Sequence, residues 1–389
     1  MKKIYSLMAG SFLLLICSIL ANQAYAQTTS MQSDHSFYLF IGTYAPADSK
    51  GIFVYRFNTT DGKASFVSAV SGIQNPSFLT LSPDHRFLYA VSETETHDNR
   101  GGQVYAYSFD QGTGTLHYIN KQWSKGNDPC NISMDKTGKW LFVANYNGGS
   151  LSVFPVEADG SVGAAIQTIE HHGHGIQPQQ TTAHIHCALP APEGNDVFVT
   201  DLGLDRVYTY ELDPATGKLS PGDPPYTEVT KGSGPRILSF SPGGKNLYLI
   251  QELGGELTVF KYQPGKLTTI QTLSNLPKDY QGKIWAADIH FSPDGRFLYA
   301  ANRDDLNDVV LYAVDKATGK LTYVSRTPTE GKTPRYFTIT PDGRFLIVGH
   351  QNSDEIVIFK RNAETGALTL TKQRIGVPHA VCLKMVPAP

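Results

Sequence analysis

The chain is a succession of short apolar runs separated by polar turns, and the repeated segments lack the 3.6-residue period of an amphipathic helix. The clearest unit is Ser292–Ala300, in which the Asp294-Gly295 pair separates two apolar runs. An Asp-Gly pair between apolar runs is typical of a β-hairpin turn. Related units occur at Ser82–Ala90, Asp135–Ala144, Ser241–Ile250 and Thr340–Val348. The pattern therefore predicts β-hairpins repeated from end to end.

The repeat has a period near fifty residues. Each hairpin is followed by a third apolar run, then by a turn of the form Asp-x-x-x-Gly, as at Asp213–Gly217 and Asp315–Gly319, and then by a short fourth run. Equivalent hydrophobic positions are spaced by 49, 53, 56, 50, 51 and 48 residues: Phe40, Tyr89, Phe142, Phe198, Tyr248, Tyr299 and Ile347. Seven copies of four antiparallel strands predict an all-β, seven-bladed β-propeller.

The two ends of the repeat indicate how the ring closes. The first copy begins near Ser36 with its second strand, whereas residues 378–385 form an unmatched strand at the C-terminus. We expect this terminal strand to complete the first blade beside residues 36–44. Residues 36–389 are thus predicted to form one propeller domain.

The N-terminus has the features of a secretory signal peptide. Lys2 and Lys3 precede an apolar run at residues 7–20, and Ala24-Tyr25-Ala26 is a small-x-small cleavage site. The run is shorter than the roughly 20 residues of a membrane-spanning helix. We therefore expect residues 1–26 to be removed on export to the periplasm or the medium, and residues 27–35 to form a flexible segment.

Composition limits the class of partner. The formal net charge is −2 and charged residues make up 17% of the chain, so bulk electrostatics do not favour nucleic-acid binding. No segment after the signal peptide could span a membrane, and we expect a monomer. Cys130, Cys187 and Cys382 remain in the mature chain, and three cysteines are too few for a disulfide scaffold. They are interpreted as small buried apolar residues.

The propeller fold predicts where polar side chains converge. The first strand of each blade lines the central channel, and the residues before it and after the second strand lie on one face. Reading these positions around the ring gives several histidines, three arginines and carboxylates at one mouth: His184, His186, His290, His379, Arg236, Arg303, Arg335, Glu93 and Glu252. Asn145 and Asp201 occupy second-strand exits of the same kind. Buried charges of this number need partners, and a small anionic ligand would satisfy them.

No cofactor is expected. The chain has no G-x-S-x-G elbow, phosphate loop or dinucleotide fingerprint. His171, His172 and His174 precede His184 and His186, but their spacing matches no metal site and no carboxylate or cysteine pattern completes one. We interpret the segment as a loop over the mouth. Asp304, Asp305 and Asp308 likewise lack calcium-loop spacing.

Several motifs together resemble the seven-bladed lactonase family, which includes the propeller-type 6-phosphogluconolactonase and the fungal 3-carboxy-cis,cis-muconate lactonizing enzyme. They are the repeated P-D-G-(K/R)-F-L-Y element, Asn145–Ser150, Asp201-Leu202-Gly203, Gly234-Pro235-Arg236, Glu252-Leu253 and Asn302-Arg303. The resemblance covers the whole mature chain. It implies metal-independent making or breaking of a lactone ester, and for the lactonizing branch it implies a machinery of one His, one Glu and two Arg. Ile237 departs from the family, whose members often have His after the G-P-R arginine.

The resemblance implies specific roles. His186, or His184 in reserve, matches the family histidine, while Arg236, Glu252 and Arg303 match the remaining machinery. We expect His186 to act as general base, Glu252 to orient it and Arg236 to stabilise the oxyanion. The other predicted contacts to substrate are Arg303, Arg335, His290, Asp201, Asn145 and Glu93.

The leading functional hypothesis is hydrolysis of a small anionic sugar lactone, of the 6-phosphogluconolactonase type. A lactonizing cycloisomerase needs the same arginines and proton-transfer pair, so the sequence leaves it open. A propeller that only binds partners is the third possibility. Convergence of charge at one mouth favours an enzyme over a binding module.

Overall fold

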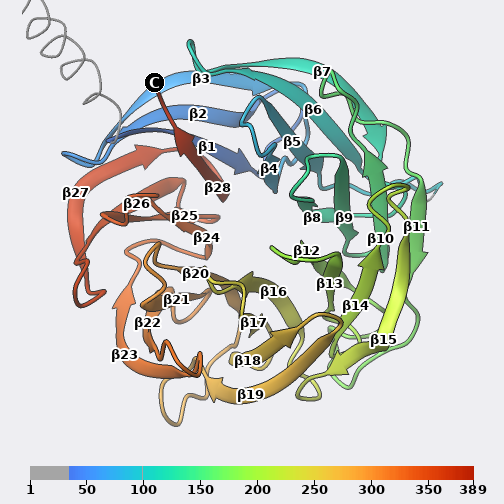
Figure 1. Ribbon diagram of the computed structural model, residues 1–389. Helices are drawn as coiled ribbons and strands as arrows, with labels where there is room; N and C mark the ends of the chain where they lie inside the picture. Colours follow the sequence, from blue (N-terminus) through green and yellow to red (C-terminus); the bar gives the residue numbers. More distant parts are fainter. Residues whose placement is uncertain (1–34, 99) are drawn as a thin grey trace, which may run out of the picture.

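The computed structural model describes residues 35–98 and 100–389, and within these ranges the chain forms 28 strands and no helix. The strands make seven four-stranded antiparallel sheets arranged as blades in a ring (Figure 1), which confirms the predicted seven-bladed propeller. The predicted signal peptide and nearly all of the predicted flexible segment lie outside the described residues. Within those residues no helix is long and apolar enough to cross a membrane.

The two inner positions of each blade carry the residues discussed below. The innermost strands surround the centre of the ring in Figure 1 and are β28 (Ala380–Pro387), β4 (Leu79–Leu81), β8 (Pro129–Met134), β12 (Ile185–Pro190), β16 (Pro235–Phe240), β20 (Ala286–Phe291) and β24 (Pro334–Ile339). The second strands are β1 (Ser36–Thr43), β5 (Phe87–Ser92), β9 (Trp140–Asn145), β13 (Asp196–Asp201), β17 (Asn246–Gln251), β21 (Phe297–Asn302) and β25 (Phe345–His350).

The two outer positions complete each blade. The third strands are β2 (Lys50–Asn58), β6 (Gln103–Asp110), β10 (Ser150–Pro155), β14 (Arg206–Leu212), β18 (Glu256–Gln263), β22 (Asp308–Val314) and β26 (Glu355–Arg361). The outermost strands are β3 (Lys63–Ser71), β7 (Thr115–Trp123), β11 (Gln167–Glu170), β15 (Leu219–Glu228), β19 (Lys266–Ser274), β23 (Leu321–Pro328) and β27 (Leu368–Gly376).

The ring is closed by the C-terminal strand, as predicted. β28 pairs antiparallel with β1, so that Phe37 lies opposite Pro387 and Ile41 opposite Leu383. The observed strand begins at Ala380, two residues later than expected. Since one blade contains strands from both ends of the chain, opening the ring requires breaking backbone hydrogen bonds as well as side-chain contacts.

The Ser/Thr-Pro-Asp-Gly units are turns closed by their own side chains. In the unit that links β20 to β21, the Ser292 hydroxyl donates to Asp294 (2.6 Å), and the same Asp294 oxygen accepts from the backbone N–H of Arg296 (3.1 Å). Gly295 has a φ of +67°, a conformation that side chains with a Cβ rarely adopt. The repeat therefore encodes its turns through local hydrogen bonds.

The tyrosines of the repeat connect neighbouring blades. Tyr248 and Tyr299 are fully buried, and their hydroxyls donate to the backbone carbonyls of Gly319 and Gly366 in the next blade (2.6 Å each). Both glycines have positive φ and end the Asp/Asn-x-x-x-Gly turns. A Cβ on Gly366 would lie 2.9 Å from the Phe297 ring, so the turn approaches the preceding blade too closely for any other residue.

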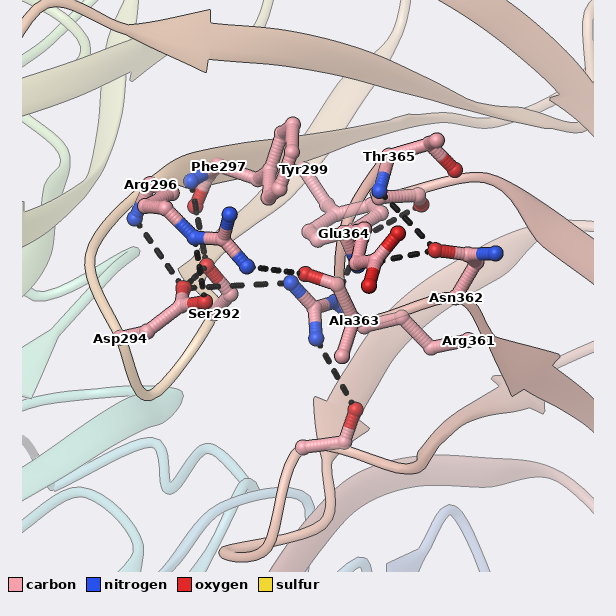
Figure 2. Close-up of polar contacts among 12 residues, drawn as sticks. Ser292, Asp294, Arg296, Phe297, Tyr299, Arg361, Asn362, Ala363, Glu364 and Thr365 are labelled. Carbon is pink, nitrogen blue, oxygen red and sulfur yellow. Dashed lines mark hydrogen bonds and ion pairs between the residues drawn. The ribbon is translucent and has the colours of Figure 1, made fainter.

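A buried arginine strengthens one of these junctions (Figure 2). Arg361 donates from Nε to the Tyr299 hydroxyl (2.7 Å) and from Nη1 to the carbonyl of Gly343 (3.0 Å). Its Nη2 lies 3.9 Å from Asp294 in the neighbouring blade, where Asp294 also pairs with Arg296. The junction between the β20–β23 and β24–β27 blades is therefore held by charge as well as by packing.

Candidate active site

Two sets of positions bring polar side chains to one end of the central channel. One set is the second position of the inner strands, and the other is the residue that follows each second strand. The pocket at this end is lined from the inner-strand set by Cys130, His186, Arg236, Arg335 and Val381, and also by Ser77, which lies two residues before β4. The second set is Tyr44, Glu93, Tyr146, Glu252 and Arg303, which contact these lining residues or one another as described below.

A single carboxylate oxygen organises the centre of this site. Oε2 of Glu252 accepts from Nε of Arg236 (2.5 Å) and pairs with Nη2 of Arg303 (2.9 Å). The same oxygen lies 3.8 Å from Nε2 of His186. All four side chains are buried. Four of the residues predicted from sequence are therefore brought together, from three different blades.

Arg236 and Arg303 retain N–H groups that have no acceptor among the described residues. Arg236 also donates from Nη1 to the carbonyl of Ala287, and Arg303 donates from Nη2 to the carbonyl of Ala286 (3.2 Å). Within the described part of the chain, Nη2 of Arg236 has no acceptor, and the buried Nε of Arg303 has none either. Unused N–H groups beside a small pocket can donate to a ligand oxygen.

His186 is held by a cysteine and a tyrosine. The Cys130 thiol lies 3.8 Å from Nδ1 of His186 and 3.5 Å from its backbone carbonyl. Tyr146 stacks on His184 with ring centroids 4.4 Å apart and meets His186 edge to face at 5.4 Å. His184 binds the Tyr146 carbonyl through Nδ1 (3.1 Å). Both predicted histidines thus contact Tyr146, but His186 is the one that approaches Glu252.

Glu93 and Arg335 form the other side of the site. Glu93 accepts from the hydroxyls of Tyr44 (2.9 Å) and Ser77. Arg335 lies over the Tyr44 ring, with its guanidinium carbon 5.2 Å from the centroid. Arg335 makes no hydrogen bond or ion pair with the described residues 35–98 and 100–389. A half-buried arginine that is stacked but not paired is suited to bind an anion.

The charges at the centre follow from burial and from the neighbouring cations. Burial alone would raise the pKa of Glu252, but Arg303, Arg236 and His186 together lower it to about 2. Burial, reinforced by Arg236, lowers the pKa of His186 well below its ordinary value. Burial lowers the pKa of Arg303 to about 10, so this group stays charged at neutral pH. The centre therefore combines an ionised carboxylate, two guanidinium ions and a neutral imidazole.

Around Arg335, burial and the neighbouring charged groups act in opposite directions on the pKa values of Arg335 and Glu93. Burial opposes the charge of Arg335, but Tyr44, Glu93 and Glu252 raise its pKa. Burial raises the pKa of Glu93, although Arg335 and two hydroxyl donors act in the opposite direction. Burial also raises the pKa of Tyr44 and of the Cys130 thiol, so both remain protonated. The pocket as a whole favours a bound negative charge.

Asn145 and Asp201 were predicted to contact the substrate, but their side chains lie within the blades and not in the pocket. Asn145 is fully buried and donates to Ser150 (3.1 Å) and Ser152 (3.3 Å) of the adjacent strand. Asp201 is fully buried and accepts from His171 (2.8 Å) and from the backbone N–H of His184 (2.9 Å). Each is the last residue of a second strand, and at this position the side chain lies within the blade.

His290 was also predicted at the mouth, and the structure corrects this. Its strand β20 begins at Ala286, so Ala287 and not His290 is equivalent to Arg236. His290 lies three residues further along the inner strand, about 10 Å away at 3.3 Å per residue. There it pairs with Asp288 (2.8 Å) and lines a separate cavity.

Tyr44 and Tyr146 are functional candidates that the sequence predictions missed. They occupy the same position, one residue beyond the second strand, as Glu93, Glu252 and Arg303. Counting one residue past the strand end, instead of weighing charge alone, would have found them. Cys130 was expected only as a small buried apolar residue and Ser77 was not singled out, yet Cys130 contacts His186 and Ser77 donates to Glu93.

The histidine-rich segment is anchored by its own contacts. Nε2 of the buried His171 binds the Tyr210 hydroxyl (2.8 Å), and its Nδ1 binds Asp201. Across the part of the chain that the structure describes, no group of three or more His, Cys, Asp or Glu side chains is arranged to hold a metal ion. Cys130, Cys187 and Cys382 are free and buried, as predicted.

Comparison with known proteins agrees with this geometry. The sequence profile described as "Lactonase, 7-bladed beta-propeller" matches residues 38–385. The chain belongs to the seven-bladed β-propeller lactonase family. The family resemblance predicted from the sequence is thereby confirmed.

Similar members of the lactonase family are named for sugar-lactone hydrolysis. A 6-phosphogluconolactonase of Bacillus subtilis is 34% identical, with 89% of this chain and 97% of the relative aligned. A 6-phosphogluconolactonase of Formosa agariphila is 37% identical over 89% of this chain and 99% of its own. The solved structure of a periplasmic gluconolactonase of Pseudomonas aeruginosa is 38% identical, with a TM-score of 0.87 over 91% of this chain and all of that chain.

Proposed function

We propose that this member of the lactonase family hydrolyses a sugar 1,5-lactone, with 6-phospho-D-glucono-1,5-lactone as the leading substrate and 6-phosphogluconate as its product. The observation that carries the proposal is the Glu252 oxygen shared by Arg236 and Arg303 beside His186. Lactone hydrolysis needs a proton acceptor for water and positive charge at the carbonyl oxygen, and these residues supply both. The names of the similar relatives support the same reaction class.

The proposed reaction begins with water attack on the lactone carbonyl carbon. The neutral imidazole of His186 takes a proton from the water as the new C–O bond forms. The carbonyl electron pair moves to its oxygen, where Nη2 of Arg236 donates a hydrogen bond to the oxyanion. Ionised Glu252, whose oxygen lies 3.8 Å from Nε2 of His186, stabilises the imidazolium that results.

Collapse of the tetrahedral intermediate completes the proposed reaction. The carbonyl re-forms, the bond to the ring oxygen breaks, and the His186 imidazolium protonates the departing ring oxygen. The product is an open-chain aldonate whose new carboxyl group ionises. His184 is the alternative candidate for the general base. It stacks on Tyr146, and no contact among the described residues brings it to Glu252.

Arg335 is the proposed anchor for the anionic group of the substrate. Within residues 35–98 and 100–389 it has no hydrogen-bond or ion-pair partner, and its stacking on Tyr44 fixes the plane of the guanidinium. A planar guanidinium donates two parallel hydrogen bonds to a phosphate or a carboxylate. Arg303 and the Glu93 carboxyl group would complete the substrate contacts from the opposite walls.

The test is a direct assay of the purified mature chain. D-Glucono-1,5-lactone, its 6-phosphate and a carboxymuconate are supplied separately, and acid release or loss of diene absorbance is followed after subtraction of the uncatalysed rate. The proposal expects turnover of a lactone, fastest for the 6-phosphate. Turnover of the carboxymuconate alone would establish the cycloisomerase, and turnover of none would leave a binding module.

We further propose that residues 1–26 direct export and that the mature chain acts outside the cytoplasm as a monomer. The Lys2-Lys3 pair, the apolar run and the Ala24-Tyr25-Ala26 site support this, as does the periplasmic location in the name of the Pseudomonas aeruginosa relative. Expression in a Gram-negative host followed by N-terminal sequencing of the periplasmic protein should give Gln27 as the first residue. Recovery of an uncleaved chain in the cytoplasm would contradict it.

A further inference from the structure

The central channel contains a second polar cavity at the end opposite the proposed active site. The side chains of Phe78, Ile237 and Tyr336 line both spaces and separate them. The second cavity, here called the lower channel, has a volume of about 320 Å³. Its polar lining includes Ser133, Asp288, His290, Tyr336 and Lys384. This volume is within the range of small-molecule sites.

Three of these side chains lie at one level around the ring. Lys384 pairs with Phe40, Ser133 with Phe142, and His290 with Tyr299 in the adjacent second strands. Phe40, Phe142 and Tyr299 are equivalent positions of the fifty-residue repeat. Since the blades are related by that repeat, the ammonium, hydroxyl and imidazole groups face the same section of the channel.

Lys384 carries a positive charge with no carboxylate partner among the described residues. Its Nζ donates to the Tyr336 hydroxyl (2.5 Å) and lies over the rings of Phe78 (4.6 Å) and Tyr336 (4.8 Å). Tyr336 accepts from the lysine, so its own hydroxyl proton is free to be donated further. Aromatic rings hold the ammonium in place but do not neutralise it.

Among the described residues that line the lower channel, the one carboxylate, Asp288, is already engaged. Asp288 is buried and accepts from Nε2 of His290 (2.8 Å) and from the backbone N–H groups of Ile289 (3.0 Å) and Phe337 (3.4 Å). The imidazole of His290 is fixed further by edge-on contacts with Tyr336 and Phe337. Nδ1 of His290 has no partner within the described ranges, and because Nε2–H is directed at Asp288, Nδ1 can donate to a ligand oxyanion as part of the imidazolium.

Ser133 provides the clearest sign of a missing partner. Its hydroxyl oxygen is inaccessible to solvent yet forms no hydrogen bond within residues 35–98 and 100–389. A buried hydroxyl without a partner costs about 1–3 kcal/mol. Ser133 lines the lower channel, so a rotation of its side chain would let the hydroxyl donate to a ligand oxygen that also faces the Lys384 ammonium.

We propose that the lower channel is a second binding site, which takes a small oxyanion, a carboxylate or phosphate group, between Lys384, Ser133 and His290. The anion would receive charge-assisted hydrogen bonds from Lys384, donation from Ser133 and Tyr336, and contact with the His290 ring. The site is separate from Arg236, Glu252 and Arg335, so it goes beyond the proposed lactone chemistry and does not require it.

The test is titration calorimetry, which measures the binding of inorganic phosphate and, separately, of acetate to the mature chain. The variants are Lys384→Met, which keeps the apolar stem, and Arg335→Met at the other end of the channel. Lys384→Met should weaken binding at one class of site at least about tenfold, because charged hydrogen bonds contribute about 1.5–3 kcal/mol. Arg335→Met should leave that class unchanged. The preferred probe identifies the group that the site takes.

Two further measurements keep the result interpretable. His290→Gln removes the imidazole and leaves Lys384 in place, and it should also weaken anion binding. It therefore provides the test if Lys384→Met proves poorly folded. Lactonase kcat and KM should stay within about twofold of wild type in Lys384→Met, since the two spaces are separated. Unchanged phosphate and acetate binding in both Lys384→Met and His290→Gln, or complete loss of binding in Arg335→Met, would overturn the proposal.

Discussion

Arg236 and Glu252 are sixteen residues apart in sequence and form a buried ion pair, with Nε and Oε2 separated by 2.5 Å. Arg236 is the second residue of an inner strand and Glu252 follows the second strand of the same blade, so antiparallel pairing brings them together at one end. The same carboxylate oxygen also binds Arg303 from the next blade. Through Arg303 this ion pair joins two blades, and it lies beside the pocket, so it supports the fold and is placed for the proposed chemistry.

The first prediction concerns Glu252→Gln. Removing the negative charge leaves two buried guanidinium groups without an anion, which typically costs about 3–5 kcal/mol. We expect a large fall in the free energy of unfolding, measured by urea titration, and a fall in kcat on the lactone of at least about tenfold. Glu355→Gln, which removes a partly exposed carboxylate paired with Arg374, should leave both nearly unchanged.

The difference in free energy of unfolding between wild type and Glu252→Gln should depend on pH with a defined sign. The folded pKa of Glu252 is lowered from 4.5 to about 2, so its ionisation stabilises the fold above the unfolded value. The stability gap between wild type and Glu252→Gln should be full above about pH 5 and shrink as the pH falls towards 2. A gap that grows on acidification would contradict the assigned ion pair.

The second prediction concerns Tyr299→Phe at the blade junction shown in Figure 2. The change removes the hydrogen bonds from Tyr299 to Gly366 and from Arg361 to Tyr299, and leaves the buried Arg361 Nε unsatisfied. We expect a loss of about 1–3 kcal/mol in the free energy of unfolding, with kcat retained. Tyr323→Phe on an exposed outer strand is the matched control and should be neutral.

The fold was predictable because its signals are local and repeated. The turn chemistry of Ser292–Arg296 recurs in several blades, and each copy independently specifies a hairpin. The same repeat predicted closure by the C-terminal strand. The structure changed only the boundaries, by a residue or two.

Most of the site was predictable to within one strand position, whereas His290 was misplaced by three residues. Along a strand, adjacent side chains point to opposite sides, so a one-residue error exchanges a pocket residue for a sheet residue. Asn145 and Asp201 were chosen for their polarity, whereas Tyr146, one residue later, reaches the pocket. His290 was misplaced because β20 starts with two alanines, which carry no polar signal and lack the proline that precedes Arg236 and Arg335.

The third prediction concerns Arg335→Lys. Lysine retains the charge but not the planar pair of donors or the stacking on Tyr44. For a phosphorylated lactone we expect KM to rise about tenfold with little change in kcat, because the lost hydrogen bonds are remote from the reacting carbon. For the unphosphorylated lactone the change should be smaller. Steady-state kinetics on both lactones, with Arg374→Lys as the control, measures the difference, and equal effects on the two would disprove an anion anchor.

The fourth prediction separates the two histidines. His186→Ala should lower kcat by about 10²–10⁴, the usual loss on removing a general base. His184→Ala should cost much less, since His184 contacts Tyr146 and not Glu252. If His184→Ala causes the larger loss, the roles of the two residues must be exchanged.

The pH–rate profile provides the independent test of His186. A base must be neutral to accept a proton, so the rate falls as the pH drops through its pKa. Burial and Arg236 lower that pKa well below 6.5 in the free protein, so the acid limb of kcat/KM should lie well below pH 6.5. A bound anionic substrate offsets the positive charge of Arg236 and Arg335, which favours the imidazolium and raises the pKa. The acid limb of kcat should therefore lie at higher pH than that of kcat/KM for the 6-phosphate, and less so for the uncharged lactone. Coincident limbs for both substrates would show that His186 is not the group that titrates.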